Sequence, residues 1–386
     1  MINNNPGEFG EHGTPVVPSV PLTPEAIRQR KRRRVATAAL VVAALSIGTL
    51  ALLPSPYVIE QPGPVYNTLG TVTIDEKQEP MIKIEGAPTH KTTGELNLLT
   101  VSMIGNPDQS ASWLSIGLAW FDPAKTVVPI EAVFPPNVTT KQRNEENQVL
   151  MEDSQQTAIA ASLTAQKIDF ISHLTVGSIA DKMPAKDVLE VGDIITSANG
   201  TPVTDADQLR SIIDSNGTEN PVELTIERDG EAKSVSLTPV EISSNTGQTA
   251  VVIGIGLMTQ YEFPIDVTIQ LDRVGGPSAG MMFALGITDK MTEGDLAGGE
   301  NISGTGTISA DGTVGAIGGA RQKVFAAASA GSTVFLLPAG NCPDLGTGLP
   351  KGIEVFPVET LNDSLAILDA VSSKSDMGTF DRCPVG

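Results

Sequence analysis

Ser278 is the first residue that could do chemistry, because of the segment around it, GGPSAGMMFALG (residues 275–286). A proline directly before a run of good helix formers is typical of a helix start. A serine at that position can cap the helix, which requires no partner, or it can be a nucleophile at the positive end of the helix. A serine hydroxyl is a weak nucleophile, so the second interpretation requires a nearby base.

A histidine base is not indicated. His12 precedes the apolar segment described below, and His173 lies in a separate compact unit. His90 remains, but its surroundings (GAPTHKTTGE) are not typical of a Ser-His-Asp triad, and the chain has no G-x-S-x-G motif. Cysteine catalysis is a weaker interpretation still, since both cysteines occupy loop positions.

Lysine is the other base known to activate serine. It must lose its proton first, and burial can lower the pKa of an amine by several units. Lys323 lies in GGARQKVFAAASAG, a short helical segment, and is followed directly by valine, phenylalanine and three alanines. Most helical lysines are solvated, so this position alone is a weak signal.

Three segments in order resemble the proteolytic domain of Lon proteases, a family with a serine–lysine dyad: GGPSAGMMFAL, ISGTGTISADGTVGAIGGARQKVFAAASAG and VFLLPAGN. The resemblance implies that Ser278 is the nucleophile, that Lys323 is the general base, and that the Thr305 hydroxyl orients the lysine. Backbone N–H groups in the region of Gly276 and Ala279 are expected to form the oxyanion hole. Cytoplasmic members often carry an acidic residue three positions before the serine, where this chain has a glycine.

Two upstream segments extend the resemblance, so the unit between them and Ser278 is expected to be an insertion. ELNLLTVSM resembles an early strand of the Lon domain, and MEDSQQTAIAA resembles its first long helix. The intervening LEVGDIITSANGTPV and DADQLRSII resemble a PDZ domain, a fold that adds extended peptides to a sheet edge. We expect its carboxylate-binding loop just before or within residues 168–174; a spacer with a blocked groove is the alternative.

Residues 35–53 form an uncharged apolar run that is long enough to cross the ~30 Å hydrocarbon core of a bilayer. The basic cluster RQRKRRR before it predicts a cytoplasmic N-terminus and an exterior location for everything after residue 54. A cleaved signal peptide is the alternative, but its apolar region would be shorter and would start earlier. The net charge of −20 argues against nucleic-acid binding.

We therefore expect an α/β (α+β) Lon-type proteolytic domain with an inserted PDZ domain, preceded by one transmembrane helix. The expected parts are a disordered basic cytoplasmic tail (1–34), the transmembrane helix (35–54), a tether and the N-terminal part of the Lon-like domain (55–166), the PDZ domain (167–241), the catalytic part (242–372) and a C-terminal tail (373–386). The helix that carries Ser278 is expected over 278–289. Cys342 and Cys383 would both lie outside the membrane, where a disulfide between them is favoured over two free thiols. Trp113 and Trp120 are expected to pack in the core.

The expected function is ATP-independent serine endopeptidase activity on extracytoplasmic or membrane-proximal proteins, with the PDZ domain selecting peptide substrates. The chain has no G-x-x-x-x-G-K-[ST] loop, so no ATPase is indicated, and neither a cofactor nor a metal is expected. A non-catalytic PDZ scaffold at the membrane surface is the alternative. A metalloprotease is excluded because H-E-x-x-H is absent. True Lon forms hexameric rings; a homo-oligomer is compatible with this sequence, which contains no signal for one.

Overall fold

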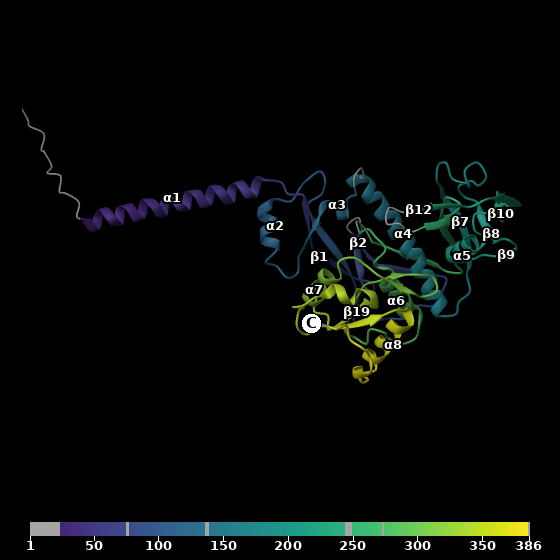
Figure 1. Cartoon of the computed structure of the whole chain (residues 1–386). Coiled ribbons are helices and arrows are strands. Elements are labelled where there is room, and N and C mark those ends of the chain that lie inside the picture. The colour runs from purple at the N-terminus through teal and green to yellow at the C-terminus, as the bar shows by residue number, and fades with distance from the viewer. Residues whose placement is uncertain (1–23, 75–76, 136–138, 244–248, 272–273, 385–386) are drawn as a thin grey trace, which may run out of the picture.

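The computed structural model describes residues 24–74, 77–135, 139–243, 249–271 and 274–384. Figure 1 shows three parts: a long N-terminal helix, an α/β body, and a smaller unit on the side of the body away from that helix. Helix α1 (Pro24–Leu52) includes the basic cluster as well as the apolar run. Its stretch Arg28–Leu52 is long and apolar enough to cross a membrane, and no other helix among the described residues meets that criterion.

The body is built on a mixed six-stranded sheet in the order β20-β19-β16-β5-β1-β6. The strands are β1 (Tyr57–Asn67), β5 (Glu95–Ile104), β6 (Thr126–Pro129), β16 (Asn301–Gly304), β19 (Val334–Pro338) and β20 (Glu354–Val358). β5, β16, β19 and β20 run parallel, whereas β1 is antiparallel to both its neighbours. The expected α/β class is confirmed.

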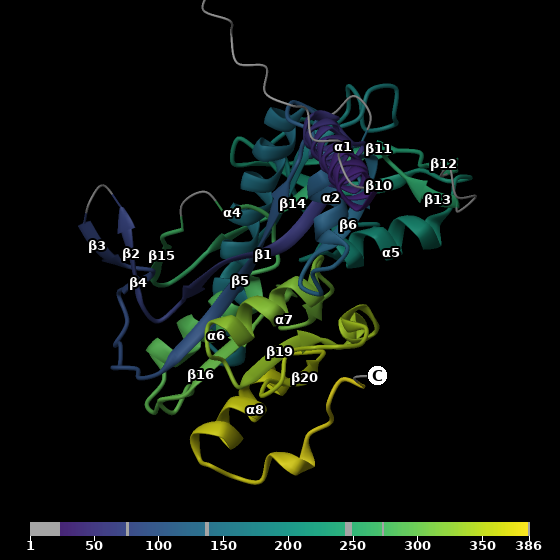
Figure 2. The same ribbon diagram turned by 90° about the vertical axis from the view of Figure 1, so that its left-hand side faces the viewer.

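Helices cover both faces of this sheet (Figure 2). On one face pack α4 (Thr140–Ala165), α6 (Gly280–Met291) and α8 (Leu361–Ser372), around a core that includes Leu336. On the other face packs α7 (Ala320–Ser329), whose core includes Phe335 and Leu337. Alternation along one strand explains this division, because successive side chains point to opposite faces. A strand covered on both faces reads as a continuous apolar run, as VFLLP does.

The inserted unit has its own sheet, in the order β11-β10-β8-β7-β14. Its strands are β7 (Ile171–Ile179), β8 (Ile194–Ala198), β9 (Thr201–Pro202), β10 (Val222–Arg228), β11 (Glu231–Leu237) and β14 (Ile255–Glu262), with helix α5 (Ala206–Asn216). The chain leaves the body after α4 and re-enters it at β15 (Asp266–Ile269), which pairs with β4 (Ile82–Glu85). The sheet thus continues beyond residue 241, where the sequence analysis ended this unit, because its edge strand is β14.

The remaining elements are short. They are β2 (Thr71–Ile74), β3 (Lys77–Pro80), α2 (Trp113–Ala119), α3 (Ile130–Val133), β12 (Val240–Ser243), β13 (Thr249–Val252), β17 (Thr307–Ile308), β18 (Val314–Gly315), η1 (Ala339–Leu345) and η2 (Met377–Thr379). Asp376, the residue before η2, accepts a hydrogen bond from the Gly378 N–H through its carboxylate. The chain then returns to the body, where Cys342 and Cys383 form a disulfide.

Two expectations about side chains and helix ends were wrong. Trp120 is exposed rather than packed in the core, whereas Trp113 is partly buried with its ring edge-to-face against Tyr57. The helix after Ser278 starts at Gly280, with Ala279 as its N-cap, so Ser278 precedes the helix. Two residues of the PSAG segment therefore form a turn, and the serine belongs to that turn.

Candidate active site

The turn that carries Ser278 is fastened to α4 by two hydrogen bonds. The Gly276 N–H donates to the Asn147 carbonyl (2.8 Å), and Ser154 Oγ donates to the Pro277 carbonyl (3.0 Å). Asn147 and Ser154 are seven residues apart, so they share one helix face. Sequence analysis missed both residues. For Ser154 the available signal was a polar side chain on the face of α4 that also carries the buried Met151 and Ala158. Asn147 acts through its backbone carbonyl, which leaves no signal in the sequence.

The backbone of Ser278 is held from the opposite side by the two residues that follow β16. The Ser278 carbonyl accepts hydrogen bonds from the Gly306 N–H (2.9 Å) and from Thr305 Oγ1 (2.9 Å). Thr305 directly follows β16 and is 1% exposed. The nucleophile turn therefore lies between α4 and the end of β16, with its backbone constrained on both sides.

Helix α7 brings Lys323 to the same place from 45 residues further along the chain. Lys323 Nζ lies 2.8 Å from Ser278 Oγ and 2.9 Å from Thr305 Oγ1. The helix begins after Gly319, whose φ is +67°, a backbone conformation that glycine adopts without strain. A Cβ at Gly319 would lie 2.5 Å from Val101 Cγ2 on β5, so this close approach of helix and sheet also requires glycine.

Burial gives Lys323 the electrostatic property that a base needs. Its side chain is 2% exposed, and this burial lowers the pKa of the amine to about 7. Desolvation disfavours the charged ammonium, so a substantial fraction is neutral near neutral pH. In the neutral state Nζ can donate to Thr305 Oγ1 and still offer a lone pair to the Ser278 hydroxyl. The Thr305 hydroxyl proton is directed to the Ser278 carbonyl, so its oxygen is free to accept from the amine.

Both dyad side chains line a cleft of about 530 Å³ between α4 and the sheet. Its walls include Thr100 and Val101 of β5, Arg143 and Asn147 of α4, and Gly318 before α7. Residues of β5 and polar residues of α4 thus line the same space as Ser278, which leaves room for a substrate chain beside the serine hydroxyl.

Gly275 and Gly276, which precede the serine, are glycine for different structural reasons. Gly276 has a φ of +87°, and its N–H is already engaged by Asn147. It is therefore not a free donor for an oxyanion hole in this arrangement, whereas Ala279 is the buried N-cap of α6. A Cβ at Gly275 would lie 2.7 Å from the Cβ of Asn147. Any larger residue at position 275 would therefore require the turn or α4 to shift.

Metal ligands do not gather at this cleft. Across the part of the chain that the structure describes, no group of three or more His, Cys, Asp or Glu side chains could hold a metal ion.

Comparison with known proteins identifies the two parts of the molecule. Residues 269–369 match the Lon protease (S16) C-terminal proteolytic domain, and residues 143–238 match the PDZ domain family. The chain contains a Lon-type proteolytic domain and a PDZ domain. The Lon-type match includes Ser278, Thr305 and Lys323, so all three side chains that meet at the cleft lie inside the Lon-type region.

The similarity to curated Lon proteases is confined to this domain. Lon protease of Neorickettsia sennetsu is 35% identical over 94 residues, which is 23% of this chain and 11% of that protein. The archaeal Lon protease of Methanothermobacter thermautotrophicus is 32% identical over 110 residues, 28% of this chain and 17% of the relative. The matched region thus spans only a small part of these proteins. The PDZ domain of an SdrC-like protein from Listeria monocytogenes is 26% identical over 22% of this chain and 85% of that structure, with a TM-score of 0.20.

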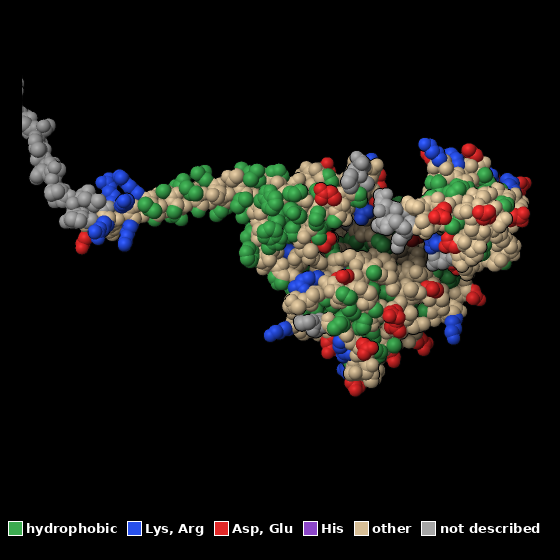
Figure 3. Space-filling view, in the orientation of Figure 1, with side chains coloured by type: hydrophobic (Ala, Val, Ile, Leu, Met, Phe, Trp, Pro, Cys, Tyr) green, Lys and Arg blue, Asp and Glu red, His purple; other side chains and the backbone are tan. Residues whose placement is uncertain are grey.

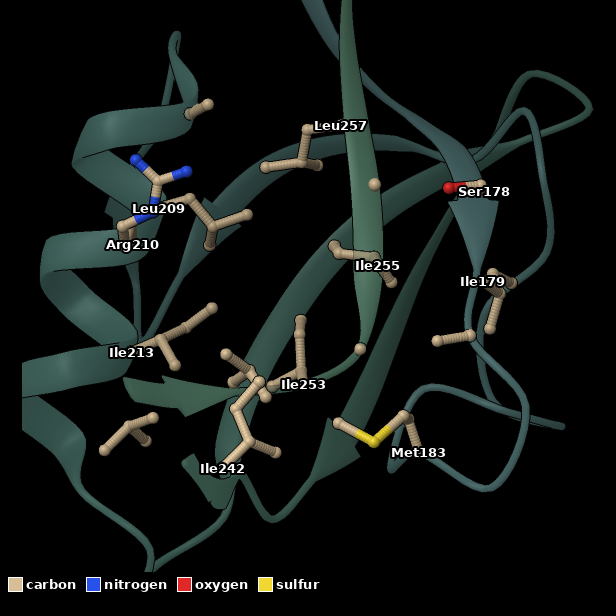
Figure 4. A pocket seen from close by; sticks show the side chains of 16 residues that line it. Ser178, Ile179, Met183, Leu209, Arg210, Ile213, Ile242, Ile253, Ile255 and Leu257 are labelled. Carbon is tan, nitrogen blue, oxygen red and sulfur yellow. The ribbon is translucent and has the colours of Figure 1, made fainter. Parts of the chain in front are cut away.

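The PDZ domain has an apolar groove of about 560 Å³ between α5 and the segment 251–257 (Figure 4). Leu209 and Ile213 of α5 face Ile253, Ile255 and Leu257 across this groove, and Met183 lies at one end. The carboxylate-binding loop expected just before or within residues 168–174 stays a prediction, but none of those residues lines the groove. The strand there, β7, is paired on both sides, with β8 and with β14, so the free edge beside α5 belongs to β14.

Proposed function

We propose that this protein is an ATP-independent serine endopeptidase. The single observation that supports the proposal most directly is the contact of Lys323 Nζ, buried and with its pKa lowered to about 7, with Ser278 Oγ at 2.8 Å. The Lon-type domain around this pair belongs to a class of serine peptidases. Activity of the whole chain, and the roles of the individual residues, are part of the proposal.

The proposed mechanism starts from the neutral amine. Lys323 accepts the Ser278 hydroxyl proton as Oγ attacks a peptide carbonyl, and the resulting ammonium then donates a proton to the leaving amine. The same lysine next accepts a proton from a water that attacks the acyl-enzyme, and it returns that proton to Ser278 Oγ as the ester bond breaks and the acid product leaves. Thr305 Oγ1 holds Nζ in place throughout by accepting a hydrogen bond from it. The oxyanion would be held by backbone N–H groups of Ser278 and Ala279, at the start of α6, where the helix dipole favours negative charge.

Substrates are proposed to be extracytoplasmic or membrane-proximal proteins. Support for this location comes from the basic cluster at the start of α1 and the apolar stretch that follows it. The PDZ groove is proposed to bind apolar peptide segments along β14, since its lining is made of aliphatic side chains.

The dyad is tested with the full chain in detergent micelles, on casein at pH 8 and without ATP. We expect Ser278→Ala and Lys323→Ala to abolish cleavage while the proteins remain folded by circular dichroism. Ser329→Ala and Lys351→Ala are matched controls on exposed residues and should cleave like the parent. A folded parent that cleaves nothing would favour a non-catalytic PDZ scaffold instead.

The PDZ role has its own test. Ile242 lines the groove and Val240 lies on the same short strand outside it. We expect Ile242→Asp to weaken binding of apolar C-terminal peptides, measured by fluorescence anisotropy, and Val240→Asp to leave it unchanged. Equal binding by both variants would mean that the groove is not the peptide site.

A further inference from the structure

A cluster of large apolar side chains lies on the outside of the body at α2 and the residues after it. Leu118, Trp120 and Phe121 are 65%, 68% and 89% exposed. Scattered surface apolar residues are ordinary, but three large ones within four positions form a contiguous patch. We call Leu118, Trp120 and Phe121 the α2 patch. Figure 3 shows hydrophobic side chains gathered over α2 and over the adjoining end of α1.

Packing of α2 on the body does not require this patch. The inner face of the helix buries Ile116 and Ala119 in a small core with Ile59 and Ala111. A helix with one buried face normally has polar residues on the other. In α2 the outward side is apolar as well, so the exposed side chains need an explanation other than folding of the body.

The position of α2 supplies that explanation, because it is joined to the end of α1. The Trp113 N–H donates to the Leu53 carbonyl (3.1 Å), and the Ser55 N–H donates to the Ala111 carbonyl (2.8 Å). Pro54 and Ser112 form an antiparallel bridge between the same two segments. The two views in Figures 1 and 2 agree that α2 lies beside the point where α1 enters the body.

We infer that the α2 patch rests in the outer interface of the bilayer that α1 spans. The inference depends on the proposal that α1 crosses the membrane. If it does, its end lies at the water–lipid boundary, and backbone hydrogen bonds hold α2 at the same level. Tryptophan and phenylalanine beside a transmembrane helix are typical of the interfacial region, where the tryptophan ring is half solvated and half in lipid. The protein then has two membrane contacts, which fix the tilt of the body and the distance of the Ser278 cleft from the bilayer.

The exposed tryptophan is also the reporter that tests the inference. The chain has only two tryptophans, so Trp113→Phe leaves Trp120 as the sole emitter. The full-length variant is reconstituted in phosphatidylcholine–phosphatidylglycerol vesicles, with or without brominated acyl chains. We expect brominated lipid to quench Trp120 emission and aqueous iodide to quench it weakly. Strong iodide quenching without bromine quenching would overturn the inference. Protection from both quenchers would overturn it too, and would assign the patch to a protein surface such as a second copy.

Variants in the patch give the matched comparison. In the Trp113→Phe background, Leu118→Ser and Phe121→Ser should lower bromine quenching by roughly half, because less apolar surface holds the segment in lipid. Val191→Ser is the control, since Val191 is equally exposed (65%) but lies in the PDZ domain, away from α1. An equal effect of the control would contradict the inference.

Failure of this inference can be told apart from failure of the membrane proposal. Extraction of membranes with alkaline carbonate retains the protein if α1 spans the bilayer, whether or not the α2 patch touches lipid. Retention combined with an unquenched Trp120 would reject the patch alone. Release would reject the transmembrane assignment on which the inference rests.

Discussion

At the scale of single residues, the site depends on one buried amine whose proton is easily lost. The Lys323 amine lies within hydrogen-bond distance of the Ser278 and Thr305 hydroxyl groups, and the residue is almost fully shielded from solvent. Because the cause of the lowered pKa is burial, it does not require a charged partner. The chemistry is thus set by where the lysine is placed rather than by which residues surround it in sequence.

The pH dependence of cleavage follows from this pKa. Below about 7 the Lys323 amine is protonated and cannot accept the serine proton, so kcat/KM should fall with decreasing pH in that range. Above about 7 the rate should level off. The measurement is casein or peptide cleavage from pH 5 to 9, corrected for unfolding. A rate independent of pH down to 5 would exclude Lys323 as the base.

Thr305 should act as a positioning residue. Thr305→Val keeps the shape of the side chain but leaves one Lys323 N–H without its acceptor, so kcat should fall about 10- to 100-fold. Thr305→Ser keeps the hydroxyl and should restore most of the rate. Rescue by serine, together with an unchanged KM in the valine variant, distinguishes positioning from a loss of packing.

At the scale of elements, the site is assembled by four segments that pack tightly. The turn before α6 holds the serine, α7 holds the lysine, β16 leads to the threonine, and α4 braces the turn. Several contacts in this assembly leave no room for a Cβ atom, which is why glycine is required at particular positions.

Gly275 is the position that tests the contact between α4 and the nucleophile turn. Gly275→Ala places a Cβ 2.7 Å from the Cβ of Asn147, so the turn or the helix must shift. We expect kcat to fall by about 10-fold or more, since small misplacements of a nucleophile are costly. Gly318→Ala is the control in the same cleft, because a Cβ there meets nothing within 4 Å. If both variants keep full activity, α4 does not set the serine position.

The disulfide ties the C-terminal segment to the body beside η1. Cys342 and Cys383 close a loop with a sequence separation of 41 residues, and both are buried. Cys383→Ser should lower the free energy of unfolding by about 2–4 kcal/mol, measured by urea denaturation. Both cysteines pack in the core that also holds Ala320 and Val324 of α7. Serine is nearly the size of the cysteine it replaces, so that core is kept and kcat of the folded fraction should be unchanged. Loss of activity in fully folded protein would mean that the tail also supports the site.

At the scale of the whole molecule, the body and the PDZ domain have no core residues in common. One core of the body packs around α4, α6 and α8, and the core of the PDZ domain lies between α5 and its sheet. Domains with separate cores can unfold separately, and motion between them is the ordinary expectation. The arrangement places α1 and the α2 patch at one side of the body and the PDZ domain at the other (Figure 1).

Because the cores are separate, destabilising the PDZ domain should leave cleavage by the Ser278–Lys323 site nearly unchanged. Leu224→Ala removes a fully buried side chain in the PDZ core and should destabilise that unit by about 2–5 kcal/mol. Casein cleavage at 25 °C should remain close to that of the parent. Leu285→Ala is the same substitution in α6 of the body and should reduce cleavage and thermal stability together. A loss of casein cleavage in Leu224→Ala would show that the two units are coupled.

The amino-acid sequence alone indicates the proposed serine–lysine chemistry and the main parts of this protein. The dyad segments around Ser278 and Lys323, the apolar run of α1 and the alternation of elements are local patterns, and local patterns report helix starts, buried runs and membrane spans. Tertiary structure decided what depends on contacts between distant segments. Only packing shows that α4 braces the nucleophile turn, that β14 rather than β7 is the free edge of the PDZ groove, and that Trp120 faces outward. Pairing partners and burial are set by residues far apart in the chain, and one sequence read alone contains no record of those distances.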